Sequence, residues 1–105
     1  MKWEITVQEL KQKFDTGEKF QLIDVRTPEE FQTANLGGLL LPLSELVMRH
    51  QELDPEAETV VLCHHGIRSA QAAVLLSQLG FTNVLSVRGG IDRWSAEIDP
   101  QIPTY

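Results

Sequence analysis

The chain has 105 residues, the usual size of one domain, and 42% of them are hydrophobic, as in an ordinary globular protein. Its formal net charge of −6 makes nucleic acids and anionic membranes poor partners, because both are negatively charged. A single cysteine excludes an internal disulfide, and neither a signal peptide nor a membrane span is recognisable. We therefore expect one domain over residues 1–105, located in the reducing cytoplasm.

The first third of the chain predicts a helix, a strand and a second helix. Thr6 and Glu9 form a capping-box pattern, and apolar residues at helical spacing then predict a helix that stops at residues 15–17. The apolar run 20–25 predicts a buried strand. Threonine, proline and glutamate at the start of residues 27–32 predict a short helix there.

The middle of the chain predicts a strand and a helix before the region of main interest. Residues 35–38 predict a turn, and residues 39–42 a short strand ended by its proline. We expect Ser44 to cap a helix that ends before the turn at 54–56. The β-branched residues 59–62 predict a buried strand.

The rest of the chain continues the alternation. Ser69 is expected to cap a helix over residues 69–79, with Gly80 closing it. Residues 83–87 predict a strand, a short helix follows Gly89-Gly90, and residues 97–105 form an irregular tail over the body. Alternating strands and helices predict an α/β fold with a parallel sheet covered on both faces. Ligands of such sheets bind at the carboxyl ends of the strands.

Cys63 lies at one such strand end, in a loop that leads directly into a helix. The loop contains Gly66, which suits a turn of positive φ, and Arg68, a permanent cation. Unpaired amides and the helix dipole concentrate positive charge at a helix start, which stabilises a thiolate over a thiol. The pattern predicts a nucleophilic Cys63, with the amides of residues 64–68 turned inward around its sulfur.

Four segments together resemble the single-domain rhodanese, or thiosulfate sulfurtransferase, family. They are LIDVRTPEEF at 22–31, LPLSEL at 41–46, CHHGIRS at 63–69 and VRGGIDRW at 87–94. The resemblance covers nearly the whole chain and implies a rhodanese-like α/β fold with a central five-stranded parallel sheet and helices on both faces. It also implies transfer of sulfane sulfur from thiosulfate or a persulfide, through a cysteine persulfide, to cyanide, a thiol or a protein.

The resemblance also implies which residues carry the reaction. Cys63 matches the family's nucleophile, and the residues expected to bind substrate are His64, His65, Gly66, Ile67, Arg68, Ser69 and Arg88. No metal or organic cofactor is implied. The histidines and the two arginines are expected to attract a small anionic sulfur donor such as thiosulfate against the overall negative charge. The tail EIDPQIPTY resembles rhodanese domains fused to E1-like adenylyltransferases, which implies a possible protein acceptor.

Other interpretations fit the sequence less well. Phosphatases of the related kind have five residues between cysteine and arginine, whereas four separate Cys63 from Arg68, so phosphatase activity is not expected. A metal site is not expected either, because adjacent loop side chains such as His64 and His65 should diverge. We expect Arg26 to pair with a carboxylate such as that of Glu30. A non-catalytic or sulfur-delivery module that binds a protein partner stays the alternative function.

Overall fold

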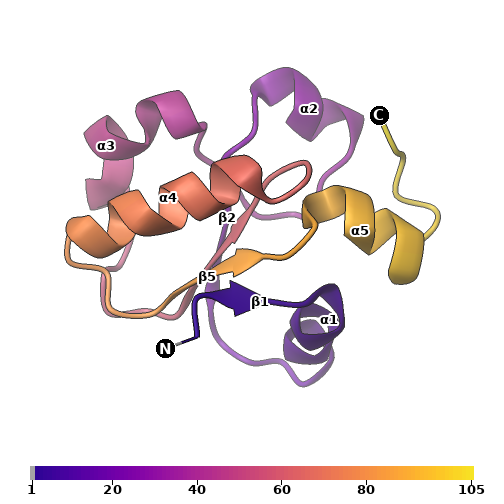
Figure 1. Ribbon diagram of the computed structural model, residues 1–105, viewed down its shortest axis with the longest axis horizontal. Helices are drawn as coiled ribbons and strands as arrows, with labels where there is room; N and C mark the ends of the chain where they lie inside the picture. The colour runs from indigo at the N-terminus through magenta and orange to yellow at the C-terminus, as the bar shows by residue number, and fades with distance from the viewer. Residues whose placement is uncertain (1) are drawn as a thin grey trace.

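A computed structural model describes residues 2–105 and contains a five-stranded, entirely parallel sheet (Figure 1). The spatial order of the strands is β1-β5-β4-β2-β3. The strands are β1 Glu4–Ile5, β2 Gln21–Asp24, β3 Leu39–Leu40, β4 Thr59–Leu62 and β5 Val84–Val87. The predicted α/β class and the five-stranded parallel sheet are confirmed. Because all strands run the same way, the segments that follow β2, β4 and β5 meet at one edge of the sheet.

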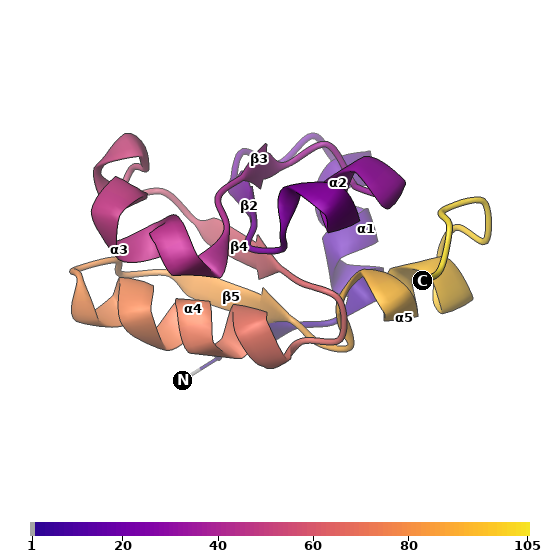
Figure 2. The same cartoon turned by 90° about the horizontal axis from the view of Figure 1, so that it is seen from above.

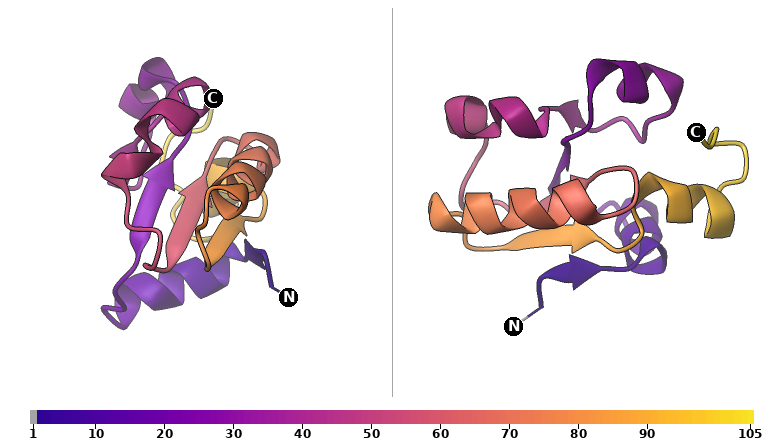
Figure 3. Two further views of the ribbon diagram at one scale, coloured as in Figure 1. Left: turned by 90° about the vertical axis from the view of Figure 1, so that its left-hand side faces the viewer. Right: turned by 45° about the horizontal axis from the view of Figure 1, so that its top comes forward.

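Helices connect the strands and cover both faces of the sheet (Figures 2 and 3). The α-helices are α1 Val7–Asp15, α2 Pro28–Thr33, α3 Leu46–Arg49, α4 Ile67–Gln78 and α5 Gly90–Glu97. Residues of α3 and α4 pack on one face, and residues of α1 and α5 pack on the other. Among the described residues, no helix is both long and apolar enough to cross a membrane.

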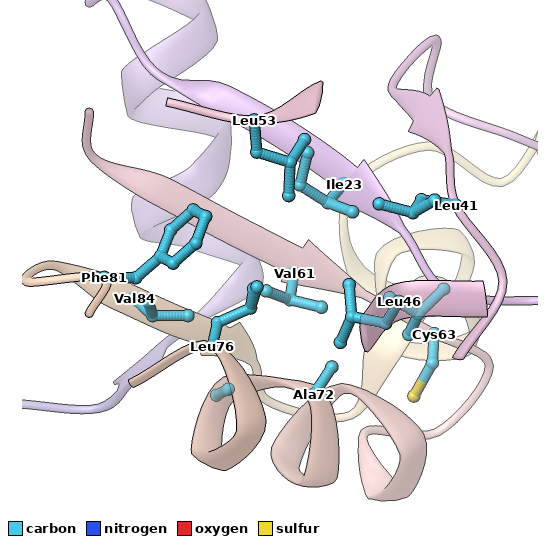
Figure 4. Packing of buried hydrophobic residues seen from close by; sticks show 12 residues of the cluster. Ile23, Leu41, Leu46, Leu53, Val61, Cys63, Ala72, Leu76, Phe81 and Val84 are labelled. Atoms are coloured by element: carbon cyan, nitrogen blue, oxygen red, sulfur yellow. The ribbon is translucent and has the colours of Figure 1, made fainter. Parts of the chain in front are cut away.

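Strand β4 divides its side chains between two hydrophobic clusters, one on each face of the sheet. Val60 and Leu62 belong to the cluster under α1 and α5, whereas Val61 belongs to the cluster under α3 and α4. This alternation is the period of two that a strand imposes on its side chains. Cys63 continues it, so its side chain joins the α4 side of the core with its sulfur turned toward the first turns of α4 (Figure 4).

Local capping signals placed most helices correctly. Both predicted capping boxes are present, Thr6 with Glu9 and Thr27 with Glu30. Gly80 follows α4 with φ of +97°, and the Phe81 amide donates to the Leu76 carbonyl, which closes the helix as predicted.

The prediction that Ser44 caps the following helix is wrong. A 3-10 turn, Leu43–Glu45, precedes the four-residue α3, and a second 3-10 turn, His50–Glu52, follows it. The first turn begins after Pro42, and Ser44 lies inside it and makes no capping hydrogen bond. Pro42, with its φ fixed at −53°, occupies the N-cap position of this turn. Ser44 therefore lies two residues too late to cap it.

Glu9 offers a test of the first capping box. Its carboxylate accepts a hydrogen bond from Lys2 at 2.6 Å and one from the Thr6 amide at 2.9 Å, which together lower the pKa of Glu9 to about 2. The stabilisation is therefore complete above the usual pKa of 4.5 and is lost as the pH falls toward 2. We expect Glu9→Gln to lower the free energy of unfolding at pH 7 by less than about 1 kcal/mol, because the pair is exposed. Urea titrations at pH 7 and pH 2.5 should show this difference shrinking at acidic pH.

Candidate active site

Cys63 occupies the first position after β4, where the chain turns into α4. Its side chain is buried, with 1% of the residue exposed. The Gly66 amide donates a hydrogen bond to Sγ at 3.0 Å, and the Ser69 hydroxyl oxygen lies 3.4 Å from the sulfur. Within residues 2–105 no hydrogen-bond acceptor is found for the amides of residues 67–69, the first turn of α4. Cys63 therefore precedes a helix start whose backbone amides are unpaired.

Gly66 determines where α4 begins. It is the N-cap of the helix and has φ of +104°, a conformation that favours glycine. The helix starts at Ile67, so the prediction that Ser69 caps a helix beginning at residue 69 is wrong. Ser69 instead lies within the first turn, where its buried hydroxyl donates to the Gly66 carbonyl at 3.1 Å and shares a hydrogen bond with Ser86 at 2.7 Å.

The start of α5 fixes the same loop from the other side. The amides of Ile91 and Asp92 donate to the carbonyls of Cys63 and His64 at 2.9 and 3.1 Å. Gly90 permits this approach, because a β-carbon at position 90 would overlap the His64 carbonyl oxygen. Figures 1 and 2 show the loop between β4 and α4 beside the first turn of α5. The carbonyls of Cys63 and His64 are thus held by backbone hydrogen bonds from α5.

Arg68 is held by a carboxylate. Its guanidinium donates to both carboxylate oxygens of Glu30 at 2.6 and 2.8 Å. The hydrogen bonds from Arg68 keep the pKa of Glu30 far below its usual range, and Glu30 in turn raises the pKa of Arg68. The prediction that Arg26 pairs with a nearby carboxylate is confirmed, but the partner is Asp24 and not Glu30, the example that the prediction named. Arg26 is fully buried and pairs with Asp24 at 2.6 Å, because strand β2 delivers both side chains to the same end of the sheet.

The two histidines of the loop do not diverge, contrary to the prediction. Their ring centroids lie 3.8 Å apart, and the other face of His64 stacks on Tyr105 at 3.9 Å with 11° between the planes. Burial, followed by repulsion from His65, lowers the pKa of His64. Together with Asp92 they offer ligand atoms within 4.8 Å of one another. The ligand atoms of a tetrahedral zinc ion lie about 3.4 Å apart, so this cluster would have to contract around an ion.

The remaining predicted site residues, Ile67, His65 and Arg88, lie at the protein surface. Ile67 is 73% exposed, and His65 faces Asp92 across 3.8 Å. Arg88 follows β5 and pairs with Glu4 at 3.0 Å. Within the described part of the chain, each arginine assigned to the site thus has a carboxylate partner, which weakens the attraction that the basic residues were expected to exert on an anion.

Three further residues shape the site, and sequence reasoning gave none of them this role. The sequence indicates Glu30 as a helix cap and as a candidate partner of Arg26, and Gly90 as part of a turn. Tyr105 was placed only in the irregular tail, yet its hydroxyl donates to Glu30 at 2.8 Å and accepts from Arg26 at 2.9 Å. The expected position of the tail over the body is confirmed at this residue. A tyrosine in a polar tail was the one available signal.

Residues 6–97 match the family described as the rhodanese-like domain. This chain belongs to that family. It is 36% identical to a sulfurtransferase of Allochromatium vinosum, over 88% of this chain and 87% of that protein. It also resembles the structure of the human single-domain sulfurtransferase TSTD1, with a TM-score of 0.78 and 26% identity over 90% of this chain and 96% of that one.

The resemblance to rhodanese domains of adenylyltransferases is also confirmed. The probable adenylyltransferase/sulfurtransferase MoeZ of Mycobacterium tuberculosis is 35% identical over 96% of this chain. That match covers only 26% of MoeZ, and other curated relatives are likewise spanned over 37% and 52% of their lengths. Rhodanese-like domains related to this one therefore occur within longer proteins as well as by themselves.

Proposed function

We propose that residues 1–105 act as a single-domain sulfurtransferase that carries sulfane sulfur as a persulfide on Cys63. The donor is thiosulfate or a persulfide, and the acceptor is cyanide, a thiol or a protein. The observation that carries the proposal is the Gly66 amide, which points at Sγ from 3.0 Å at the start of α4. The reducing cytoplasm, where a lone thiol stays reduced, is the compartment that we propose.

The residues around the sulfur suit both halves of such a reaction. A thiolate at Cys63 accepts the Gly66 hydrogen bond, and the Ser69 hydroxyl, 3.4 Å away, can turn to donate a second one. The thiolate attacks the outer sulfur of the donor, a new S–S bond forms, and the donor's own S–S bond breaks with its electron pair on the leaving group. The first-turn amides of α4 follow Gly66 directly and can donate hydrogen bonds that stabilise the negative charge on the added sulfur.

Intact-protein mass spectrometry tests the proposal. After incubation with thiosulfate or a persulfide donor, we expect the protein to gain the mass of one sulfur atom, and dithiothreitol should remove it. Addition of cyanide to the loaded protein should release thiocyanate. Two half-reactions of this kind predict double-displacement kinetics.

Cys63→Ser is the decisive variant for this measurement. It keeps the size of the side chain and the hydrogen bond from Gly66 but removes the sulfur nucleophile. We expect neither loading nor thiocyanate release. Retention of either activity by a folded variant would contradict a persulfide on Cys63.

A sulfur-delivery module is the second candidate, favoured by the exposed apolar side chain of Ile67 at the rim of a buried sulfur. A protein acceptor could cover such a rim, whereas a small anion gains little from it. The name of one curated relative, the putative sulfur carrier protein YrkF of Bacillus subtilis, agrees with this candidate. Stoichiometric loading of Cys63 without steady turnover of thiosulfate and cyanide would favour delivery over catalysis.

A further inference from the structure

The basic side chains around Cys63 are neutralised before any substrate arrives. Arg68 and Glu30 form a pair with two hydrogen bonds, and both side chains are largely shielded, with 32% and 18% exposed. Burial disfavours the charged form of His64. Arg88 is joined to Glu4, and its side chain is itself 57% exposed. The arginines and His64 therefore add little positive charge to that of the amides at the start of α4, and a strongly anionic substrate requires more.

Glu30 is itself held in place by two further groups. Its Oε1 accepts from the Thr27 amide at 3.1 Å, as the capping box of α2 requires. Its Oε2 accepts from the Tyr105 hydroxyl at 2.8 Å, and Tyr105 is fixed by stacking on His64. Arg68 consequently faces a carboxylate that is anchored on both oxygens. To bind a substrate anion, the Arg68 guanidinium would have to give up its hydrogen bonds to Glu30. Glu30 cannot follow it, because Thr27 and Tyr105 hold the carboxylate in place.

The charge of the reacting atoms differs strongly between donors. Attack of a thiolate on thiosulfate brings three negative charges together, one from sulfur and two from the dianion. Attack on an alkyl persulfide brings together only one or two, depending on whether the donor keeps its proton. Like charges at contact distance repel by about 4 kcal/mol per pair under conditions typical of a protein surface. A neutralised site thus penalises thiosulfate far more than a persulfide.

We infer that Glu30, positioned by Tyr105, is a specificity-determining residue that directs this site to persulfides of low charge rather than to thiosulfate. The inference rests on the proposed function and narrows its donor class. For a protonated persulfide RSSH, the Cys63 thiolate bonds to the outer sulfur, which keeps its proton. The S–S bond of the donor breaks, and RS⁻ leaves with the electron pair. Transfer of the sulfur to a thiol acceptor is the reverse of this step, so the site should also favour acceptors of low charge.

The test compares kcat/KM for three donors with wild type and Glu30→Gln. The donors are thiosulfate, methanethiosulfonate, which has the same kind of leaving group but one charge fewer, and the persulfide of 2-mercaptoethanol. Wild type should prefer both less charged donors to thiosulfate by about tenfold or more, equivalent to about 1.4 kcal/mol. Glutamine still satisfies a capping box, so Glu30→Gln should fold and free Arg68. It should raise the relative use of thiosulfate by about tenfold.

Glu9→Gln is the matched control, because Glu9 occupies the same capping-box position of α1 and pairs with a lysine. It changes the net charge equally and should leave the donor preference as in wild type. Arg68→Gln is a second, independent variant, since it leaves the Glu30 charge uncompensated and should disfavour thiosulfate further.

The possible outcomes separate the inference from the function on which it rests. A wild type that prefers thiosulfate, or a Glu30→Gln variant that behaves like Glu9→Gln, overturns the specificity role while sulfur transfer stands. An equal loss of all three activities in Glu30→Gln would indicate a merely structural residue and would also overturn it. A wild type that takes sulfur from none of the donors overturns the proposed function, and the inference falls with it.

Discussion

Replacing Gly90 by alanine is expected to disable the site and destabilise the protein together. A β-carbon at this position would lie 2.5 Å from the Cys63 carbonyl oxygen and would overlap the His64 carbonyl, and both are backbone atoms. Gly90 also has φ of +63°, which costs an alanine roughly 1–2 kcal/mol. Overpacking adds about 1–3 kcal/mol. We expect urea titration to show that the free energy of unfolding falls by about 2–5 kcal/mol. Sulfur loading of Cys63 should slow by about tenfold or more, because the loop that holds the sulfur must move.

Gly17→Ala separates the two causes. Gly17 has a similar φ of +68°, but a β-carbon there would meet nothing within 4 Å. This variant should show the conformational cost alone and load sulfur as wild type does. If Gly90→Ala and Gly17→Ala lose the same stability and both retain activity, close approach of α5 does not control the loop.

The buried pair of Asp24 and Arg26 should have the largest effect on stability. Asp24 is 1% exposed and accepts from Nε and Nη2 of Arg26 at 2.8 and 2.6 Å. The other N–H groups of Arg26 donate to the Ala34 carbonyl, the Tyr105 hydroxyl and the Glu30 carbonyl. Burial opposes the charge of Arg26, but these partners more than compensate, and its pKa is raised. Asp24→Asn leaves a buried cation uncompensated, and we expect a loss of about 3–5 kcal/mol.

Asp15→Asn provides the comparison for this measurement. Asp15 pairs with Lys11 at 3.0 Å on the surface of α1, and an exposed pair of this kind contributes about 0.3–0.5 kcal/mol. In thermal and urea unfolding, the loss of unfolding free energy in Asp24→Asn should therefore be about sixfold or more larger than the loss in Asp15→Asn. Similar losses would mean that the buried position of Asp24 adds nothing, which contradicts the argument from desolvation.

Signals that lie close together in the chain predicted most of the fold. The run into Cys63, the turn at Gly66 and both capping boxes depend on residues within a few positions of each other. β1 was not predicted individually, because its two residues cannot display alternation and, unlike the two residues of β3, they do not belong to an apolar run between a turn and a proline. Ser69 was misplaced as a cap because serine is a good capping residue, whereas the backbone of Gly66 decided the start of α4.

The polar contacts of the site were less accessible to sequence reasoning. Glu30 and Arg68 lie 38 positions apart, and Glu30 and Tyr105 lie 75 apart. Nothing in a local pattern selects one carboxylate over another at such separations. Arg26 shows the contrast, because its carboxylate partner is Asp24, only two positions away, and a nearby partner of this kind was expected. The sequence could indicate which charges gather at this edge of the sheet, but their pairing depends on the tertiary structure.

Because backbone groups anchor the loop, the exposed side chain of Ile67 is not needed to hold it in place. His65 and Ile67 project to the surface, while Gly66 and Gly90 supply the turn and the close approach. Exchanging Ile67 should alter which molecules approach Cys63 without disturbing the surroundings of the sulfur, whereas exchanging His65 would also remove the ring that stacks on His64. Position 67 is therefore where the surface near Cys63 can be redesigned while the backbone of the loop stays fixed.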